Sequence, residues 1–325
     1  MNRRRIAIGV SSVSGLAVVA AGAMSMVGSG TSASAVDLHA APVAAITGAA
    51  GATALAGTAQ VDTMVTVDTP AVPAQGKTPA SPAQTLTLHG SGLFDFGKQV
   101  GAIDLTAPTA ALNEVVTPSA LYARRSAVAA TATAAAVPAS AWSRGATAKA
   151  SDGEMISGGA TDPALVLAML GGVQPGAKYV GHEVVRGVPV AHYQGTLDLA
   201  QAATALTAAA TVANGGGPAA NAAAEKEALE NAAQVFKGKI PFDAYLDAEG
   251  RLRRFVASFS YAAVPGAKVL TQATSATELF GFGTPVTVVV PAAAPAAAPS
   301  GAPSTRGRRA TTPSAHPTSP TRAHK

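Results

Sequence analysis

IPFDAYLDAEGRLRRFVASFSY (residues 240–261) carries the clearest structural pattern in this chain. Apolar residues recur at alternate positions on both sides of a short polar segment; they are Ile240, Phe242, Ala244 and Leu246 before it and Phe255, Phe259 and Tyr261 after it. A period of two is that of a β-strand with one buried face. The segment between them, Asp247–Gly250, ends in a glycine, which readily adopts the positive φ that tight turns often require. We therefore predict an antiparallel β-hairpin.

The same alternation recurs along most of the chain. Further strands are predicted over residues 60–69, 84–90, 93–98, 101–106, 179–186, 190–199, 268–274 and 285–290. Because short Gly, Pro or Asp turns link nearly all of them, we expect antiparallel hairpins and not crossover units.

Helices are expected in two places. Asp162 and Pro163 provide a capping side chain and a first-turn proline, and Gly171 follows the apolar run as a stop signal. The alanine-rich residues 198–236, interrupted by GGGP, are either a packed helix pair or a surface insertion. The fold class predicted is α+β: one large antiparallel sheet with two or three helices covering one face.

Both ends of the chain differ from its middle. A basic start, MNRRR, an apolar stretch from Ile6 to about Val27 and an Ala-Ser-Ala motif predict a signal peptide over residues 1–35. The alternative is an uncleaved anchor, since the stretch approaches the roughly 20 residues that span a bilayer. Residues 36–58 are expected to be a flexible linker, 59–291 the folded domain and 292–325 a disordered Pro/Ala/Arg-rich tail. We expect export to the cell envelope or beyond, outside the cytoplasmic membrane.

Composition excludes several classes of function. The chain has no cysteine, which rules out disulfides, a thiol nucleophile, cysteine-ligated zinc and a lipidated N-terminal cysteine. The formal charge is +5, but three basic residues lie in the signal segment and five in the tail, which leaves 15 basic against 18 acidic residues elsewhere. We therefore expect no nucleic-acid partner for the folded part, whereas the tail could contact anionic polymers or a membrane surface.

No catalytic motif stands out. His182 and Glu183 begin a sequence like HExxH, but Arg186 replaces the second histidine and the segment is a predicted strand. Residues 90–92 (GSG) are interpreted as a turn, and the glycines at 215–217 lack a following Lys-Ser/Thr. His192 shares a face with other polar residues of its strand, and the register decides whether His182 or Glu183 meets it. We predict no enzymatic activity, no metal and no cofactor; a hydrolase would need His192 or Glu183 buried beside a second acid or a nucleophile.

Several motifs in a fixed order resemble the actinobacterial LppX/LprG lipoprotein family. They are Tyr122 after a strand, the lone Trp142, DPALVLAML (162–170), GHEVVRGVPVAHYQG (181–195), PFDAYLDAEGRLRR (241–254) and FGTPVTVVVP (282–291). That family is similar in fold to the LolA and LolB lipoprotein carriers. The resemblance covers about residues 60–291 and implies a strongly curved sheet, a half-barrel, with helices covering its concave face and an apolar cavity for acyl chains. Unlike typical members, this chain has no lipobox cysteine.

We therefore expect a secreted envelope protein that binds or carries lipids or acylated glycolipids. Ten large apolar residues on predicted inner faces are candidate cavity-lining residues: Phe94, Phe96, Leu165, Leu167, Leu170, Tyr193, Leu197, Phe242, Phe255 and Phe259. The alternative is a non-catalytic structural or interaction protein in which the same fold has closed its cavity.

Overall fold

The structure is a computed structural model. It describes residues 40–74, 80–108, 110–118, 120–127, 141–145, 152, 155–156, 162–212, 219–262 and 269–291. The predicted signal peptide and the predicted tail lie outside these residues. No helix within the described residues is long and apolar enough to cross a bilayer.

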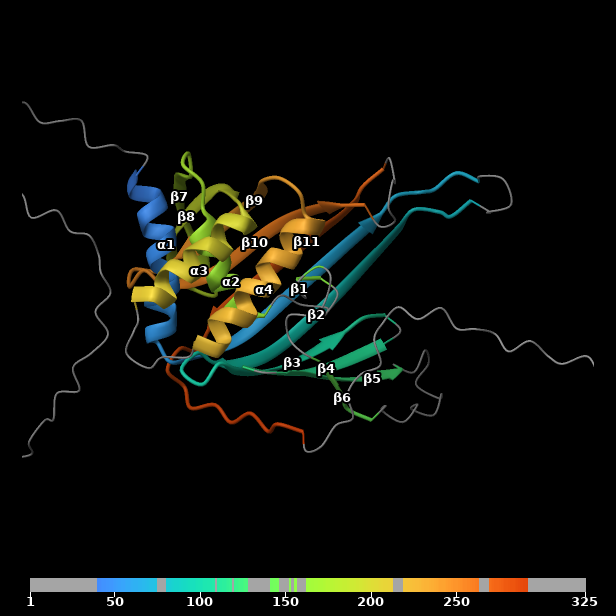
Figure 1. Cartoon of the computed structure of the whole chain (residues 1–325), viewed down its shortest axis with the longest axis horizontal. Helices are drawn as coiled ribbons and strands as arrows, with labels where there is room; N and C mark the ends of the chain where they lie inside the picture. The colour runs from blue at the N-terminus through green and yellow to red at the C-terminus, as the bar shows by residue number, and fades with distance from the viewer. Residues whose placement is uncertain are drawn as a thin grey trace, which may run out of the picture.

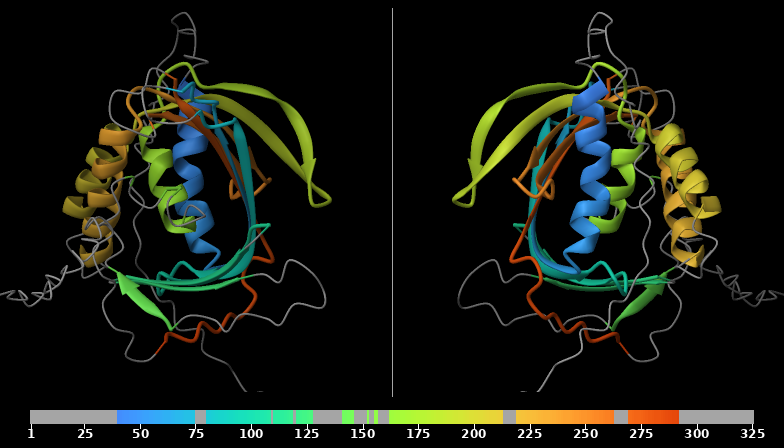
Figure 2. Two further views of the ribbon diagram at one scale, coloured as in Figure 1. Left: turned by 90° about the vertical axis from the view of Figure 1, so that its right-hand side faces the viewer. Right: turned by 90° about the vertical axis from the view of Figure 1, so that its left-hand side faces the viewer.

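Eleven strands of the described chain form one antiparallel sheet. They are β1 (Thr58–Thr69), β2 (Gln84–Asp95), β3 (Val100–Thr106), β4 (Ala110–Thr117), β5 (Ala120–Ala127), β6 (Ser143–Gly145), β7 (Lys178–Val185), β8 (Val188–Leu197), β9 (Ile240–Leu246), β10 (Leu252–Tyr261) and β11 (Thr271–Phe280). Their order is β6-β5-β4-β3-β2-β1-β11-β10-β9-β8-β7, so the first and last strands pair at the middle of the sheet. The sheet curves strongly around the helices, as a half-barrel does (Figure 2).

Four α-helices lie on the concave side of the sheet (Figures 1 and 2). They are α1 (Ala40–Leu55), α2 (Pro163–Met169), which continues into the short 3-10 turn η1 (Leu170–Gly172), α3 (Leu199–Val212) and α4 (Ala219–Val235). Helices α1 and α2 lie inside the curve, and α3 and α4 lie side by side farther from the sheet. The predicted fold class, with helices over the concave face of one large sheet, is confirmed.

The core between sheet and helices is built from large apolar side chains. Fully buried members include Phe94, Phe242, Phe255 and Phe259 from the sheet and Leu170, Leu199 and Leu229 from the helical layer. Each such side chain stabilises the fold by about 1.5–3 kcal/mol relative to an exposed position. The alternating patterns of β9 and β10 are therefore those of strands with one face in this core.

The predicted cap of α2 is confirmed. Oδ1 of Asp162 accepts a hydrogen bond of 2.7 Å from the N–H of Ala164, and Pro163 occupies the first turn. Of the two alternatives for the alanine-rich region, the structure has the packed helix pair, because α3 and α4 contact each other. Ala202 and Ala232 are fully buried, as expected where small side chains let helices approach closely.

The linker predicted over residues 36–58 is corrected by the structure, because Ala40–Leu55 form α1. Ile46 and Thr53 of this helix are fully buried, and Thr53 Oγ1 accepts a hydrogen bond of 2.8 Å from the N–H of Leu252 in β10. This helix was not predicted because most residues of α1 are alanine or other small residues, which show no sustained apolar period. The folded unit thus begins at α1, ahead of residue 59.

Two further interpretations of the sequence were wrong. The GSG segment is no turn, because β2 runs through it without interruption. A Cβ on Gly92 would lie 2.1 Å from the carbonyl oxygen of Ala102, so glycine is required where β3 approaches closely. In addition, residues 284–290, expected to include a strand, are not assigned to the sheet, whereas β4 and β5 were not predicted.

The β7–β8 hairpin bends over the convex face of the sheet (Figure 2). Arg186 at its turn makes ion pairs with Asp62 of β1 and, at 2.6 Å, with Glu278 of β11. These partners are several strands away along the sheet. The turn is therefore fastened to the middle of the convex face, and the concave face is left to the helices.

Candidate ligand pocket

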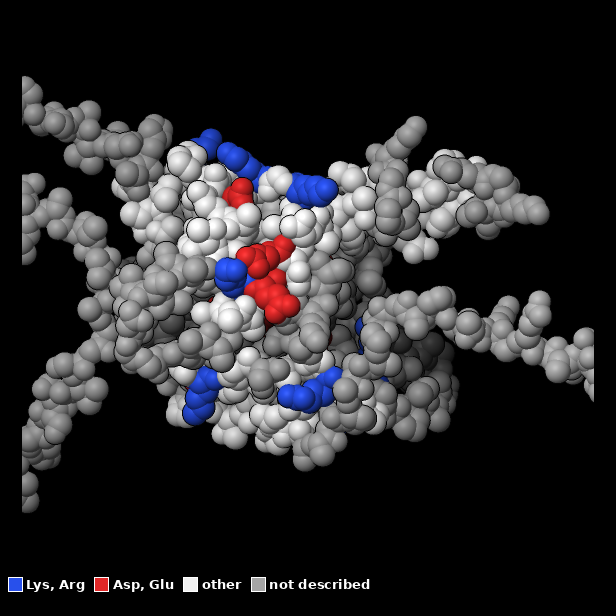
Figure 3. Space-filling model, in the orientation of Figure 1, with Lys and Arg blue, Asp and Glu red and all other residues white. Residues whose placement is uncertain are grey.

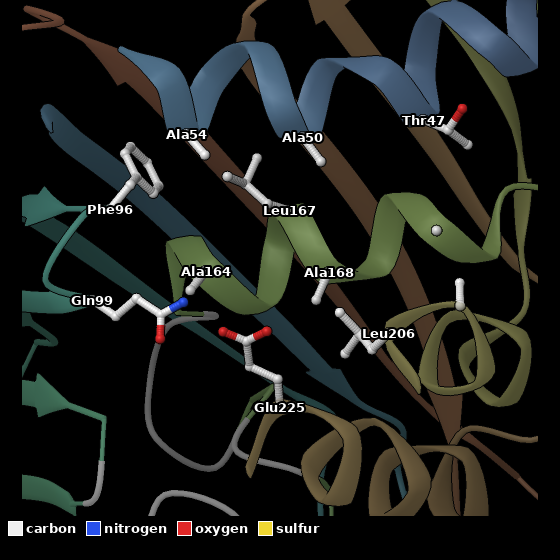
Figure 4. A pocket seen from close by; sticks show the side chains of 12 residues that line it. Thr47, Ala50, Ala54, Phe96, Gln99, Ala164, Leu167, Ala168, Leu206 and Glu225 are labelled. Atoms are coloured by element: carbon white, nitrogen blue, oxygen red, sulfur yellow. The ribbon is translucent and has the colours of Figure 1, made fainter. Parts of the chain in front are cut away.

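A pocket of 310 Å³ lies between the helices and the turn that joins β2 to β3 (Figure 4). Its lining residues are Thr47, Ala50 and Ala54 of α1, Phe96 and Gln99 of the β2–β3 turn, Ala164, Leu167 and Ala168 of α2, Gly171 of η1, Ala205 and Leu206 of α3, and Glu225 of α4. Most of these residues are apolar. A cavity of this size is at the lower end of the range found for small-molecule sites.

Small side chains at helical spacing create the pocket. Ala50 and Ala54 are four residues apart on α1, and Ala164, Ala168 and Gly171 follow one stripe of α2 and η1. Residues three or four apart share a face of a helix, so two stripes of small residues face the same space. Larger residues at these positions would fill that space with protein atoms, as in an ordinary helix interface.

Glu225 and Gln99 bring polar groups into this apolar surround (Figure 4). Burial raises the pKa of Glu225 to about 8, and the nearby Asp162 carboxyl adds to the shift. Burial likewise raises the pKa of Asp162 to about 6, against the opposing effect of the hydrogen bond from Ala164. Glu225 therefore holds a proton at neutral pH.

Gln99 is placed by a strained turn. Its φ is 54°, in the left-handed region that non-glycine residues rarely adopt. The preceding residues are fixed by Asp95, whose carboxylate accepts from the backbone N–H of Lys98 at 2.9 Å and pairs with its ammonium at 2.7 Å. Strained positions of this kind persist only where the surroundings hold them. The Oε1 atom of Gln99 is buried and has no hydrogen-bond partner in the described structure.

The ten residues predicted to line a cavity are all in the core or against it, but they are not all at the pocket. Phe96 and Leu167 line it. Seven others are buried in the core around it: Phe94, Leu165, Leu170, Leu197, Phe242, Phe255 and Phe259. Tyr193 is partly buried against the same core. The alanines, Gln99 and Glu225 of the lining were not predicted from the sequence, because alanine at i, i+4 spacing carries little hydrophobic contrast.

Charge is sparse on the helical side of the molecule. The acidic group at the centre of Figure 3 lies over α4, which carries Glu225, Glu227 and Glu230. Lys226 of the same helix is paired with Glu230 at 2.6 Å. Among the described lining residues, none is basic.

A second polar cluster lies on the opposite, convex face of the sheet. The Nδ1 atom of His192 lies 2.8 Å from Glu183 Oε1, and its Nε2 atom lies 2.7 Å from Asp243 Oδ1. The register thus brings Glu183, not His182, to His192. The imidazole ring also stacks on Tyr245, with ring centroids 4.3 Å apart.

Both ring nitrogens of His192 thus contact carboxylate oxygens, and the ring packs on Tyr245 between β8 and β9. Across the described residues, no group of three His, Cys, Asp or Glu side chains is arranged to hold a metal ion.

Comparisons with known proteins show likeness only at the level of the fold. No family model matches the sequence, and no curated protein matches it. Among solved structures, the lipoprotein LppX of Mycobacterium tuberculosis is 14% identical, with a TM-score of 0.39, covering 77% of this chain and 99% of LppX. LprF of Mycobacterium bovis is 15% identical (TM-score 0.33; 78% and 98% covered). A LolA superfamily protein of Nitrosomonas europaea is 7% identical (TM-score 0.23; 75% and 92% covered). These neighbours are of the LppX and LolA kinds that the sequence motifs resemble.

Proposed function

We propose that this protein binds the acyl chain of a lipid in the pocket between α1, α2, α3 and α4 and carries it in the cell envelope, without enzymatic activity. The observation that carries the proposal is the pocket itself, an apolar space kept open by small side chains on three helices. A carrier needs volume and apolar lining, and no reactive group. Export and envelope location are part of the proposal and are supported by the signal-like sequence of residues 1–35.

The volume limits what can be carried. At roughly 30 Å³ for each water-sized group, 310 Å³ holds about ten non-hydrogen atoms. At ~0.8 kcal/mol for each buried methylene, a ten-carbon chain gains about 8 kcal/mol before the costs of association. That gain corresponds to an affinity no tighter than about micromolar. We therefore propose a single acyl chain of medium length as the ligand; an acylated glycolipid would insert one chain only.

The experiment is native mass spectrometry of the exported protein, followed by solvent extraction and lipid analysis, together with titration of a fluorescent ten-carbon acyl probe. A bound single-chain lipid and saturable uptake of the probe are expected. An empty protein that takes up no probe would favour the alternative, a closed fold that acts by binding a protein partner.

Filling the pocket provides the matched control. Ala50→Leu adds three carbon atoms to the lining, which at roughly 30 Å³ each remove about 90 Å³ and should weaken probe binding about tenfold or more. Ala44→Leu makes the same change on the exposed side of α1 and should leave binding unchanged. Equal affinities of the two variants would place the probe elsewhere.

A further inference from the structure

The polar end of the pocket has hydrogen-bonding capacity that no described residue of the protein uses. Of the three polar lining residues, Thr47 donates its hydroxyl to the carbonyl oxygen of Val43 at 2.9 Å. Gln99 Oε1, in contrast, is buried without a partner, and the Glu225 carboxyl makes no hydrogen bond to any described residue. An unsatisfied buried acceptor costs about 1–3 kcal/mol. A ligand group that reached these two side chains would recover this free energy.

One of the two side chains offers an acceptor and the other offers a donor. The amide oxygen of Gln99 accepts. Glu225, protonated at neutral pH because of its partial burial and its proximity to Asp162, donates through its O–H. Both side chains point into the same part of the pocket in Figure 4. A hydroxyl group, which donates and accepts through one oxygen atom, complements both.

Charged head groups fit less well. A carboxylate or phosphate would place a negative charge beside Glu225 and Asp162, with no basic side chain among the described lining residues to compensate it. An ammonium group would have to ionise Glu225, whose pKa is raised by partial burial and by the nearby Asp162, and desolvation weakens the attraction of such an ion pair. The pocket therefore discriminates by the charge of the head group as well as by the length of the chain.

We propose that the pocket selects a single-chain amphiphile of about ten carbon atoms with an uncharged, hydroxyl-bearing head, whose hydroxyl group lies between Gln99 and Glu225. This inference rests on the proposed function, because it assumes that the pocket is a lipid site. It adds the class of ligand and the two side chains that recognise it.

The test is competition of four ten-carbon ligands against the fluorescent acyl probe at pH 7: 1-decanol, decanoate, decylamine and decane. We expect 1-decanol to bind at least tenfold more tightly than decanoate or decylamine. Decanoate or decylamine binding as tightly as 1-decanol would overturn the inference while leaving the lipid site intact. If none of the four competes and the probe does not bind, the proposed function itself fails.

Variants of the two side chains identify the source of the preference. Gln99→Met keeps the length of the side chain but removes the acceptor. It should weaken the binding of 1-decanol about tenfold, whereas the binding of decane should be unchanged or tighter. Glu225→Leu should act in the same direction, and Glu225→Gln, which keeps a donor, should restore most of the affinity. Equal affinity of wild type, Gln99→Met and Glu225→Leu for 1-decanol would refute the assignment. Because decane uses only the apolar lining, its binding reports whether each variant still forms the pocket.

Discussion

Replacement of Glu225 by glutamine should change how stability depends on pH. In the folded state burial raises the pKa of Glu225 from 4.5 to about 8. The unfolded chain therefore releases this proton near pH 4.5, whereas the folded chain keeps it until about pH 8. Because a raised folded-state pKa means that the unfolded state binds fewer protons in this range, the wild type loses stability as pH rises from about 4.5 to 8. Glutamine has no proton to lose.

The size of the effect follows from the shift. At pH 7, the cost of keeping Glu225 protonated is about 1.4 kcal/mol for each pH unit above 4.5, or about 3 kcal/mol. The charged group facing Glu225 from another element is Asp162 at the start of α2. Its own pKa, raised to about 6, gives a similar trend at lower pH, and this trend is present in both proteins.

The assay is urea unfolding followed by circular dichroism at pH 4, 6 and 8. Relative to wild type, Glu225→Gln should gain about 4 kcal/mol in free energy of unfolding between pH 4 and pH 8. Glu227→Gln changes an exposed glutamate on the same helix and should show a constant difference. If the difference for Glu225→Gln also stays constant within about 0.5 kcal/mol, Glu225 is not buried as described and the account of the polar end of the pocket is wrong.

Three predictions concern the scaffold, each measured by urea unfolding. Gly92→Ala should destabilise by about 2 kcal/mol or more, because its Cβ has no room beside β3, whereas Gly145→Ala, at an open position, should be nearly neutral; equal effects would contradict the close strand contact. Thr53→Val should cost about 1–3 kcal/mol, because it leaves the buried N–H of Leu252 unpaired; a neutral result would mean that α1 is not fastened to β10. His192→Ala should cost about 1 kcal/mol or more, because it removes a largely buried ring that stacks on Tyr245, whereas Glu183→Gln, at a half-exposed carboxylate, should cost less than about 1 kcal/mol; a larger loss for Glu183→Gln would contradict this account.

Strands of the sheet could be predicted where one face of the strand is exposed to solvent and the other buries large side chains. The period of two in β9 and β10 is clear because Phe242, Phe255 and Phe259 contrast with polar neighbours. In β2 two glycines broke this contrast and suggested a turn. Helix α1 was not predicted, because alanine and glycine show little hydrophobic periodicity. The burial of Ile46 and Thr53 depends on contacts with the rest of the fold. Long-range contacts, not the local pattern, make these segments part of the fold.

The pocket was hidden for a related reason. The predicted lining residues are large, and large residues such as Phe255 fill the core with their own side chains. Empty volume arises where side chains are small, which sequence patterns report as an absence of signal. In a sequence, alanine indicates helix propensity and glycine indicates a helix end. In the structure, Ala50, Ala164 and Gly171 instead line the pocket and leave room for it. Of the polar residues, Gln99 gave no signal, because its placement depends on the conformation of the β2–β3 turn.

The sheet and the helices contribute differently to the space available for a ligand. The aromatic inner face of the sheet belongs to the buried core, and the pocket lies in the helix layer, where alanines on α1 and α2 line it. A lipid with two or three buried chains needs more than the 310 Å³ of this pocket. Helix α1 is fastened near its C-terminal end by the hydrogen bond between Thr53 and Leu252. If the other end of α1 moves away from α2 to admit a larger cargo, a disulfide introduced between these two helices should abolish binding of that cargo while sparing the ten-carbon probe.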